Sequence, residues 1–363
     1  MNINFYGIIY GMTGYDSHCR QLVNALFKKE PHIYLEALKP PRQKLQLTEN
    51  EHTMLKNKFF KDGTSIVVAL PPDWQKIWAK NPKHFIGFLV WEGDRILKDW
   101  LSILNNKKVD QIWVPSSHTK QAIINTDKKL ERKIRIVPHG IDLNLFKPKK
   151  DKKLHKKLTF ISNKGWARGI NDRGGTQFLL MAFTQEFSKI ESTKVALKVK
   201  INTSYNSPDW NLKNEINKLN LDKDRPNIEI LTTMIDFKKL PEFYYKGDVF
   251  VSPTMSESFG LTLAEAMACG LPIITTNFGG QTEFVNEKNG WLVDYKLIPS
   301  KQSTYKGVNW ALPDINQLRK IMRYCVDNPE EVRKKGLKAA KDIKKFTWEN
   351  SASAALKFLD KLN

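Results

Sequence analysis

The chain has 363 residues, a hydrophobic fraction of 41% and a formal net charge of +21. This length exceeds what one hydrophobic core usually serves, so we expect two domains. No apolar run reaches the roughly 18 residues that span a bilayer, and the N-terminus lacks a basic segment followed by a cleavage site. A membrane-spanning protein and a secretory leader are therefore not expected.

The cysteines and the positive charge narrow the possible classes of protein further. Cys19, Cys269 and Cys325 are widely spaced and form no C-x-x-C pattern, so we expect unpaired thiols in a reducing cytoplasm and no zinc site. The positive charge favours polyanionic partners: nucleic acid, an anionic membrane surface or phosphorylated substrates. Lysines that only cover solvated faces would give the same composition, so this reading stays open beside the first.

Strand and helix patterns alternate in the first part of the chain. The predicted strands are residues 3–10, 64–70, 84–91, 110–115 and 134–139, and the helices between them are residues 17–29, 94–106 and 117–126. This alternation predicts a parallel sheet with helices on both faces. The lysine-rich segment 147–157 is typical of an exposed connector between domains.

The alternation restarts after this connector. The predicted strands are residues 158–163, 195–202, 227–233, 248–253 and 272–276; the helices are residues 176–187, 211–220, 239–247 and 260–269, with three more between 313 and 362. We expect an α/β fold of two doubly wound, Rossmann-like domains that face each other across a cleft. The ligand would lie at the carboxyl ends of the strands.

The most informative stretch is residues 251–280, VSPTMSESFGLTLAEAMACGLPIITTNFGG. A strand ends at Pro253, a polar turn follows, and a helix runs to a glycine at position 270, which suits a helix end. The N-terminus of that helix offers backbone N–H groups to an anion. Glu257 and Glu265 stand eight positions apart around this turn. A carboxylate on either side of an anion site suits a ligand with hydroxyl groups on both sides of a phosphate, such as a nucleotide-sugar.

This stretch resembles the E-x7-E signature of retaining glycosyltransferases with the GT-B fold, and of glycosyltransferase family 4 in particular. The resemblance implies that Glu257 contacts the donor sugar, that Glu265 holds the nucleotide ribose, and that Ser258, Phe259, Gly260 and Leu261 lie near sugar and phosphate. It spans nearly the whole chain. It implies an N-terminal domain on the acceptor side (1–147), a C-terminal donor domain (148–345), and a final helix (346–363) that packs back on the first domain.

Two places in the first domain also resemble the family. Gly11, Gly14 and Tyr15 follow the first strand and match the loop that borders the donor phosphates and the acceptor. After the strand at residues 84–91 the family often has a histidine near the reacting sugar, whereas this chain has Glu92. Glu92 would help to orient the acceptor; alternatively, it pairs with Arg95 while Trp91 packs beside it.

The chain departs from the family where positive charge should neutralise the departing diphosphate. The family has an arginine and then a lysine before the first helix of the second domain. Alignment places Arg168 at the arginine and Gly174 at the lysine. We expect Arg173 to replace the missing lysine, with Lys164 and Lys200 as further candidates for phosphate contact. Cations there would stabilise the leaving group.

The predicted activity is transfer of a sugar from a nucleotide-sugar to an acceptor hydroxyl, with retention and without a metal or another cofactor. The acceptor would be a glycan, a lipid-linked glycan or another hydroxyl compound. We expect a cytoplasmic location, with peripheral contact to an anionic membrane, and no nucleic-acid partner. The alternatives are a nucleotide-sugar epimerase of the same fold and a basic nucleic-acid- or membrane-binding protein with a degenerate sugar site. The D-x-D at Asp222–Asp224 is interpreted as a solvated turn.

Overall fold

The computed structural model describes residues 1–11, 13–40, 47–150, 153–203, 206–207 and 209–362. The chain divides into two compact units, Met1–Gly140 with Phe346–Asn363, and Ile141–Lys345. The sequence placed the domain boundary after residue 147, whereas the division by contacts falls after Gly140. The C-terminal segment belongs to the first unit.

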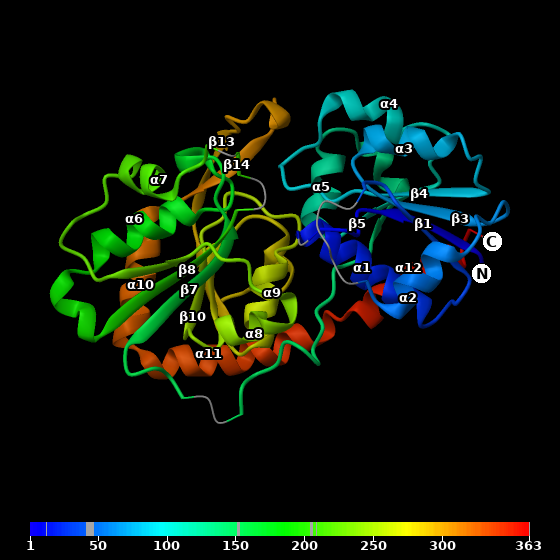
Figure 1. Cartoon of the computed structure of the whole chain (residues 1–363). Coiled ribbons are helices and arrows are strands. Elements are labelled where there is room, and N and C mark those ends of the chain that lie inside the picture. The colour runs from blue at the N-terminus through cyan, green and yellow to red at the C-terminus, as the bar shows by residue number, and fades with distance from the viewer. Residues whose placement is uncertain (12, 41–46, 151–152, 204–205, 208, 363) are drawn as a thin grey trace. The chain divides into compact units, whose positions relative to one another are not determined.

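The first unit is built on a six-stranded sheet of order β2-β1-β3-β4-β5-β6, and all its strand pairs are parallel. In Figure 1, α1, α2 and α12 lie on one side of this sheet, and α3 and α4 lie on the other. The elements are β1 (Ile3–Gly7), α1 (Gly14–Phe27), β2 (Ile33–Ala37), α2 (Glu49–Lys56), β3 (Thr64–Val68), α3 (Pro71–Trp78), β4 (His84–Phe88), α4 (Leu101–Leu104), β5 (Gln111–Val114), α5 (Ser117–Ile124), β6 (Ile134–Ile136) and α12 (Trp348–Leu359).

The second unit has a six-stranded parallel sheet of order β12-β11-β10-β7-β8-β9 and an antiparallel hairpin, β13–β14. Helix α6 packs with α10, and α9 packs with α11 (Figure 1). The elements are β7 (Leu158–Gly165), α6 (Thr176–Glu186), β8 (Val195–Asn202), α7 (Leu212–Lys218), β9 (Ile228–Leu231), α8 (Leu240–Tyr244), β10 (Val249–Ser252), α9 (Leu261–Ala268), β11 (Ile273–Thr276), β12 (Gly290–Val293), β13 (Tyr295–Pro299), β14 (Asn309–Pro313), α10 (Ile315–Asp327) and α11 (Pro329–Asp342).

The strand order of the second sheet fixes where a ligand is expected. The chain starts in the middle at β7, runs outward through β8 and β9, and then returns to β10 on the other side of β7. Connections therefore leave the carboxyl ends of β7 and β10 in opposite directions. In open parallel sheets a crevice forms at such a reversal, and ligands bind there.

The predicted α/β fold of two parallel sheets is confirmed. The strands β2 and β12 and the β13–β14 hairpin were not predicted from the sequence. The helix predicted at residues 94–106 is shorter in the structure, where only a 3-10 turn and the four-residue α4 form. The strand β13 is largely exposed, so it lacks the continuous apolar run by which the buried strands were found.

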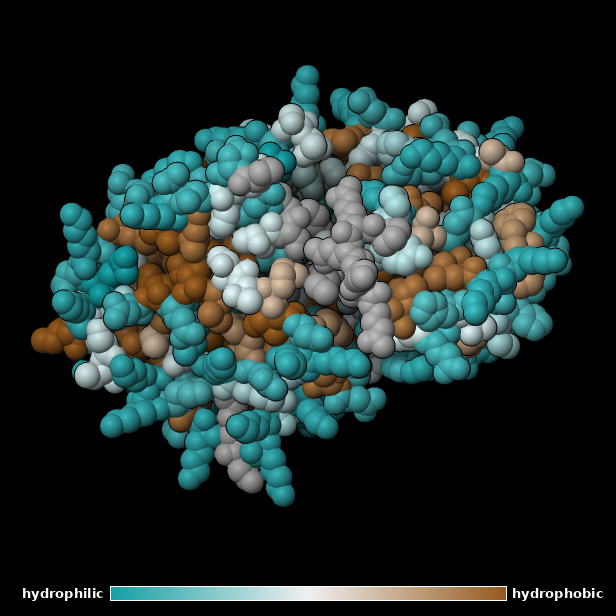
Figure 2. All heavy atoms as spheres, viewed as in Figure 1, coloured by the Kyte–Doolittle hydropathy of each residue, from teal (hydrophilic) through white to brown (hydrophobic). Residues whose placement is uncertain are grey.

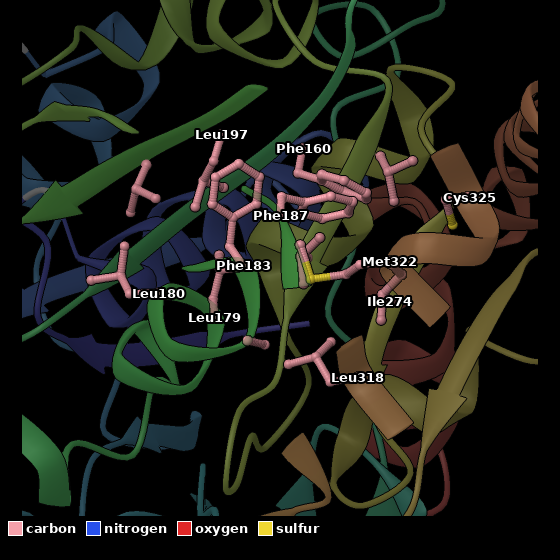
Figure 3. Close-up of a cluster of buried hydrophobic side chains, with 14 of the residues drawn as sticks. Phe160, Leu179, Leu180, Phe183, Phe187, Leu197, Ile274, Leu318, Met322 and Cys325 are labelled. Atoms are coloured by element: carbon pink, nitrogen blue, oxygen red, sulfur yellow. The ribbon is translucent and has the colours of Figure 1, made fainter. Parts of the chain in front are cut away.

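A core of aromatic and aliphatic side chains holds α6 and α10 to the second sheet. Phe183 of α6 packs with its ring centroid 6.5 Å from that of Phe160 on β7 and 5.3 Å from that of Phe187. Leu318 and Met322 of α10 complete this cluster (Figure 3). Fully burying such side chains stabilises the fold by about 1.5–3 kcal/mol each.

Polar side chains cover most of the surface that Figure 2 shows, with hydrophobic patches between them. Among the described residues, no helix combines the length and the apolar character that a bilayer span requires. Cys19, Cys269 and Cys325 are all buried free thiols.

Two histidines are buried side by side in the first unit. The ring centroids of His18 on α1 and His139 lie 4.1 Å apart, and Trp348 of α12 lies 6.0 Å from the first and 5.9 Å from the second. Burial holds the pKa of His18 well below its usual value, helped by its neighbour, and burial lowers the pKa of His139 to about 3. Both rings are therefore neutral at pH 7, and they pack as aromatic groups between α1 and α12.

We expect the free energy of unfolding to decrease as the pH falls below about 6.5, the ordinary pKa of histidine. The unfolded chain then binds protons that the folded chain does not, which costs up to about 1.4 kcal/mol per pH unit for each ring. In His18→Phe, the loss of stability between pH 7 and pH 5, measured by denaturant unfolding, should be smaller than in the wild type. His52→Gln, at an exposed position on α2, is the control and should keep the wild-type loss. An unchanged loss in His18→Phe would contradict this account.

Candidate functional site

The candidate site of the second unit lies at the carboxyl ends of its central strands. Lys164 is the penultimate residue of β7, and Lys200 lies near the end of β8, in register opposite Asn163 of β7. Glu257 stands in the loop that follows β10, the strand that pairs with β7 on its other side. The site therefore lies at the reversal of strand order.

Lys164 and Glu257 form a direct ion pair across this reversal. The Lys164 ammonium donates a hydrogen bond to Glu257 Oε1 at 2.5 Å. The guanidinium of Arg173 lies 3.9 Å from the other carboxylate oxygen. The side chains of Lys164 and Glu257 are only 7% and 19% exposed, so little water screens the pair.

The ionisation of Glu257 depends on these cations. Burial acts to raise the pKa of the Glu257 carboxyl, but the charges of Lys164 and Arg173 and the hydrogen bond from Lys164 hold the pKa below its usual value. Glu257 is therefore a carboxylate at neutral pH, and it accepts hydrogen bonds only.

Glu265 has a different environment. It lies on α9, and Tyr244 at the end of α8 donates a hydrogen bond to its Oε2 at 2.5 Å. Burial raises the pKa of Glu265 to about 7, although this hydrogen bond and the charges of Lys164 and Lys200 act to lower it. The Tyr244 hydroxyl in turn accepts a hydrogen bond from Asn163 at 3.2 Å. Tyr244 was not predicted as a site residue, because nothing in its sequence pattern distinguishes its helix from an ordinary core helix.

Two buried lysines, Lys164 and Lys200, lie at the candidate site. Among the residues that the structure describes, the buried cations are Lys164, Lys200 and Lys335. The Lys335 ammonium has partners that suit a structural role: it donates to the Gly290 carbonyl at 2.8 Å and lies over the Trp291 ring. Lys200 is 4% exposed, and burial lowers the pKa of its ammonium, although the charge of Glu265 opposes this. Two buried ammonium groups beside two carboxyl groups can accommodate an anion with attached hydroxyl groups.

The structure explains why position 174 is glycine. A Cβ placed on Gly174 would lie 2.9 Å from the Gly165 carbonyl oxygen and 3.0 Å from the Asp172 carboxylate, closer than a side chain ordinarily approaches. The same point is 3.8 Å from the Cβ of Lys164. The resemblance predicts a cation at position 174, at the start of α6. Lys164 on β7 supplies a cation instead, from a Cβ that lies close to that position.

The two arginines of this region differ in their surroundings. Arg168 is exposed, and its backbone N–H is bound by Asp172. Arg173 ties the loop before Glu257 to the start of α6: its Nη1 donates to the Ser256 carbonyl at 2.7 Å, and its own carbonyl accepts from the Met255 N–H at 2.8 Å. The structure therefore brings Arg173 close to Glu257 and leaves the Arg168 side chain on the surface.

The residues from Ser258 to Leu261 lead into α9. Gly260 has a φ of +95°, in the left-handed region that favours glycine, and it directly precedes the first helical residue. Ser258 and Phe259 are buried, and their backbone packs against Gly280. The Gly280 N–H donates to the Glu257 carbonyl at 2.7 Å. A Cβ on Gly280 would lie 1.9 Å from the Ser258 carbonyl oxygen. The backbone of the loop after β11 thus fixes the backbone that carries Glu257.

We expect Gly280→Ala to displace the Glu257 loop, because the added methyl group overlaps the Ser258 carbonyl. Overpacking of this kind costs about 1–3 kcal/mol, so the free energy of unfolding should fall by that amount in denaturant titration, and ligand binding at the loop should weaken. Gly165→Ala is the matched control, since its nearest contact, the Asn202 carbonyl, is at an ordinary 3.6 Å. Equal stability of the two variants would show that the loops do not pack as described.

The glycine loop of the first unit already contains a bound carboxylate. Asp16 of α1 accepts hydrogen bonds from the Gly11 N–H at 2.7 Å and from the Thr13 N–H at 3.1 Å. Gly14 is exposed and Tyr15 is half-buried at the start of the helix. The resemblance to the family predicts that this loop borders the donor phosphates, but the internal carboxylate of Asp16 already occupies two of the loop's N–H donors.

Glu92 lies in the first unit, beyond the end of β4. Its backbone carbonyl is 2.9 Å from Nε2 of His118, in the first turn of α5. Arg95 pairs with Asp94 at 3.3 Å. Trp91 is buried, packs against Trp100 and donates to the Arg95 carbonyl at 2.7 Å. Trp91 therefore has a packing role, as the alternative interpretation of this segment predicts.

Asp222 and Asp224 lie in a turn. The Asp222 carboxylate accepts from the Asp224 N–H at 2.9 Å, and Asp224 accepts from the Lys189 N–H at 3.3 Å. Within the described part of the chain, no group of three or more His, Cys, Asp or Glu residues is arranged to hold a metal ion.

Comparison with known sequences gives the family of this region. Residues 167–302 match the family described as Glycosyl transferases group 1. A D-inositol 3-phosphate glycosyltransferase from Arthrobacter sp. (strain FB24) is 25% identical over 229 residues, which cover 61% of this chain and 49% of the relative. The match thus spans about half the length of that curated relative.

Solved structures similar to this chain share its fold. A sucrose-phosphate synthase from Thermosynechococcus elongatus has a TM-score of 0.71 at 18% identity, over 99% of this chain and 98% of its own. The Anabaena protein HepE in complex with UDP-glucose has a TM-score of 0.69 at 14% identity, over 99% and 100%. Residues 167–302, which carry Glu257 and Glu265, thus match the group 1 glycosyl transferases, in a chain that has the GT-B fold.

Proposed function

We propose that the protein is a retaining glycosyltransferase, which moves a sugar from a nucleotide-sugar to an acceptor hydroxyl. The observation that carries this proposal is the buried cluster of Lys164, Lys200, Glu257 and Glu265 at the reversal of strand order. The cluster joins cations for a diphosphate to carboxyl groups for hydroxyls, and both glutamates lie within the matched family region.

We assign the two glutamates to the two hydroxyl-bearing ends of the donor. Glu257 would accept hydrogen bonds from the transferred sugar. Glu265 would hold the ribose through Oε1, since Tyr244 engages its Oε2. The backbone from Ser258 to Leu261 would lie beside the phosphates, where the N-terminus of α9 favours an anion.

The cations would stabilise the leaving diphosphate. We assign Lys164 and Arg173 to this role first, because both already lie beside a carboxylate of the site. Lys200 is a second contact from β8, and Arg168 would have to approach from the surface. Fixed positive groups beside the leaving oxygens lower the barrier because they need no rearrangement as charge develops. With these cations in place we propose a metal-independent reaction, so transfer in EDTA should equal transfer in added magnesium or manganese.

We propose that the first unit binds the acceptor, through the loop with Gly11, Gly14 and Tyr15 and through Glu92. The acceptor would be a glycan, a lipid-linked glycan or another hydroxyl compound. In a retaining reaction, its hydroxyl approaches the face from which the diphosphate departs. The basic surface would favour a place beside an anionic membrane in the cytoplasm.

The test begins with a thermal-shift and hydrolysis screen of nucleotide-sugars, with UDP-glucose first because the similar HepE structure contains it. With the donor that stabilises the protein, Glu257→Ala should reduce transfer or donor hydrolysis by at least about a hundredfold, as loss of a key polar contact to the reacting group does. Glu242→Gln, at an exposed position on α8, should keep wild-type activity. Near-normal turnover by Glu257→Ala would contradict the assignment.

A further inference from the structure

Without ligand, the groups assigned to the diphosphate and to the sugar bind each other. Lys164 donates to Glu257 at 2.5 Å, and both side chains are largely buried. Arg173 is a weaker third partner at 3.9 Å, and its Nη1 is engaged by the Ser256 carbonyl. The pair uses one of the three N–H donors of Lys164, so a ligand that becomes the main ion-pair partner of the lysine has to displace Glu257.

Breaking a buried ion pair from one side is expensive. A charge left without its partner in a buried site costs several kcal/mol in proteins where this has been measured. A nucleoside diphosphate would supply new oxygens to Lys164 but would leave Glu257 with only Arg173 nearby. A nucleotide-sugar would supply partners to both groups at once, phosphate oxygens to the lysine and sugar hydroxyls to the glutamate.

We infer that the Lys164–Glu257 ion pair is a latch that couples recognition of the diphosphate to recognition of the sugar. The inference rests on the proposed function and adds a property of its site. The intact donor breaks the ion pair and gives new partners to both groups. A nucleoside diphosphate, which is the product, also breaks the pair but leaves Glu257 without a replacement for Lys164, so it binds more weakly. The site therefore discriminates against its own product. Coupling of this kind is reciprocal, because each part of the ligand eases the binding of the other.

The latch depends on where the lysine stands. A cation extending from position 174 has no room, because the Gly165 carbonyl and the Asp172 carboxylate surround that point. From the end of β7, Lys164 instead faces the loop after β10 and reaches Glu257. The ion pair is thus made by a lysine at the end of β7, in a site where position 174 is glycine.

The test measures binding of UDP to the wild type, Glu257→Gln and Glu257→Ala by isothermal titration calorimetry. Removing the glutamate frees Lys164, so both variants should bind UDP more tightly than the wild type, by about tenfold, which corresponds to about 1.4 kcal/mol. Their preference for UDP-glucose over UDP should shrink at the same time. Glu242→Gln makes the same change of charge at an exposed position and should leave UDP binding unchanged.

A second comparison separates the latch from simple repulsion between Glu257 and the diphosphate. Repulsion would persist without the lysine, whereas the latch would not. In a Lys164→Met background, Glu257→Gln should therefore bring no gain in UDP affinity, which a double-mutant cycle measures directly. A full gain in that background, or no gain in the wild-type background, would overturn the latch. If no nucleoside diphosphate or nucleotide-sugar binds the wild type, the proposed function fails, and the latch with it.

Discussion

Two ammonium groups are held out of water at the carboxyl ends of β7 and β8, and this constraint shapes the rest of the site. Burial penalises a charge by several kcal/mol unless other groups compensate it. The compensating groups come from the far side of the strand reversal, Glu257 after β10 and Glu265 on α9. The sheet order determines which groups can meet, because it places the ends of β7 and β10 side by side.

The surrounding loops are packed so that these charges stay in place. Arg173 fixes the turn before Glu257, because its side chain donates to the Ser256 carbonyl and its own carbonyl accepts from the Met255 N–H. After the turn, the Gly280 N–H donates to the Glu257 carbonyl and the Gly280 backbone packs against Ser258. Asn163 and Tyr244 form a short chain of hydrogen bonds that ends on Glu265. Backbone loops tied in this way keep the charged side chains close to the place where they would stabilise a leaving group.

The sequence predicted the fold well, for a physical reason. Buried parallel strands are continuous apolar runs and the glycine at position 270 ends a helix by its conformation, so both leave local patterns that can be read. The exposed β13 and the partly exposed β2 leave none. The assignment of glutamates, lysines and arginines to roles stays a prediction, because it depends on a ligand.

Which of the cations are buried was not predictable from the sequence. Alignment gave most weight to Arg168 and Arg173, whereas the structure buries Lys164 and Lys200 and leaves Arg168 exposed. Pairing across the sheet is a long-range property, since Lys164 and Glu257 are 93 positions apart. The same holds for Tyr244 and Glu265. Asp16, by contrast, follows Thr13 at the spacing of a capping box, so its bonds to the glycine loop of the first unit had a local signal in the sequence.

The most direct measurement of the central claim is a crystal structure of the protein with a bound nucleotide-sugar that resists hydrolysis. The account predicts the diphosphate at the carboxyl ends of β7 and β10, with Lys164 Nζ within hydrogen-bond distance of a phosphate oxygen. Glu257 should have turned to the sugar hydroxyls. An unbroken Lys164–Glu257 pair, with the diphosphate bound elsewhere, would contradict it.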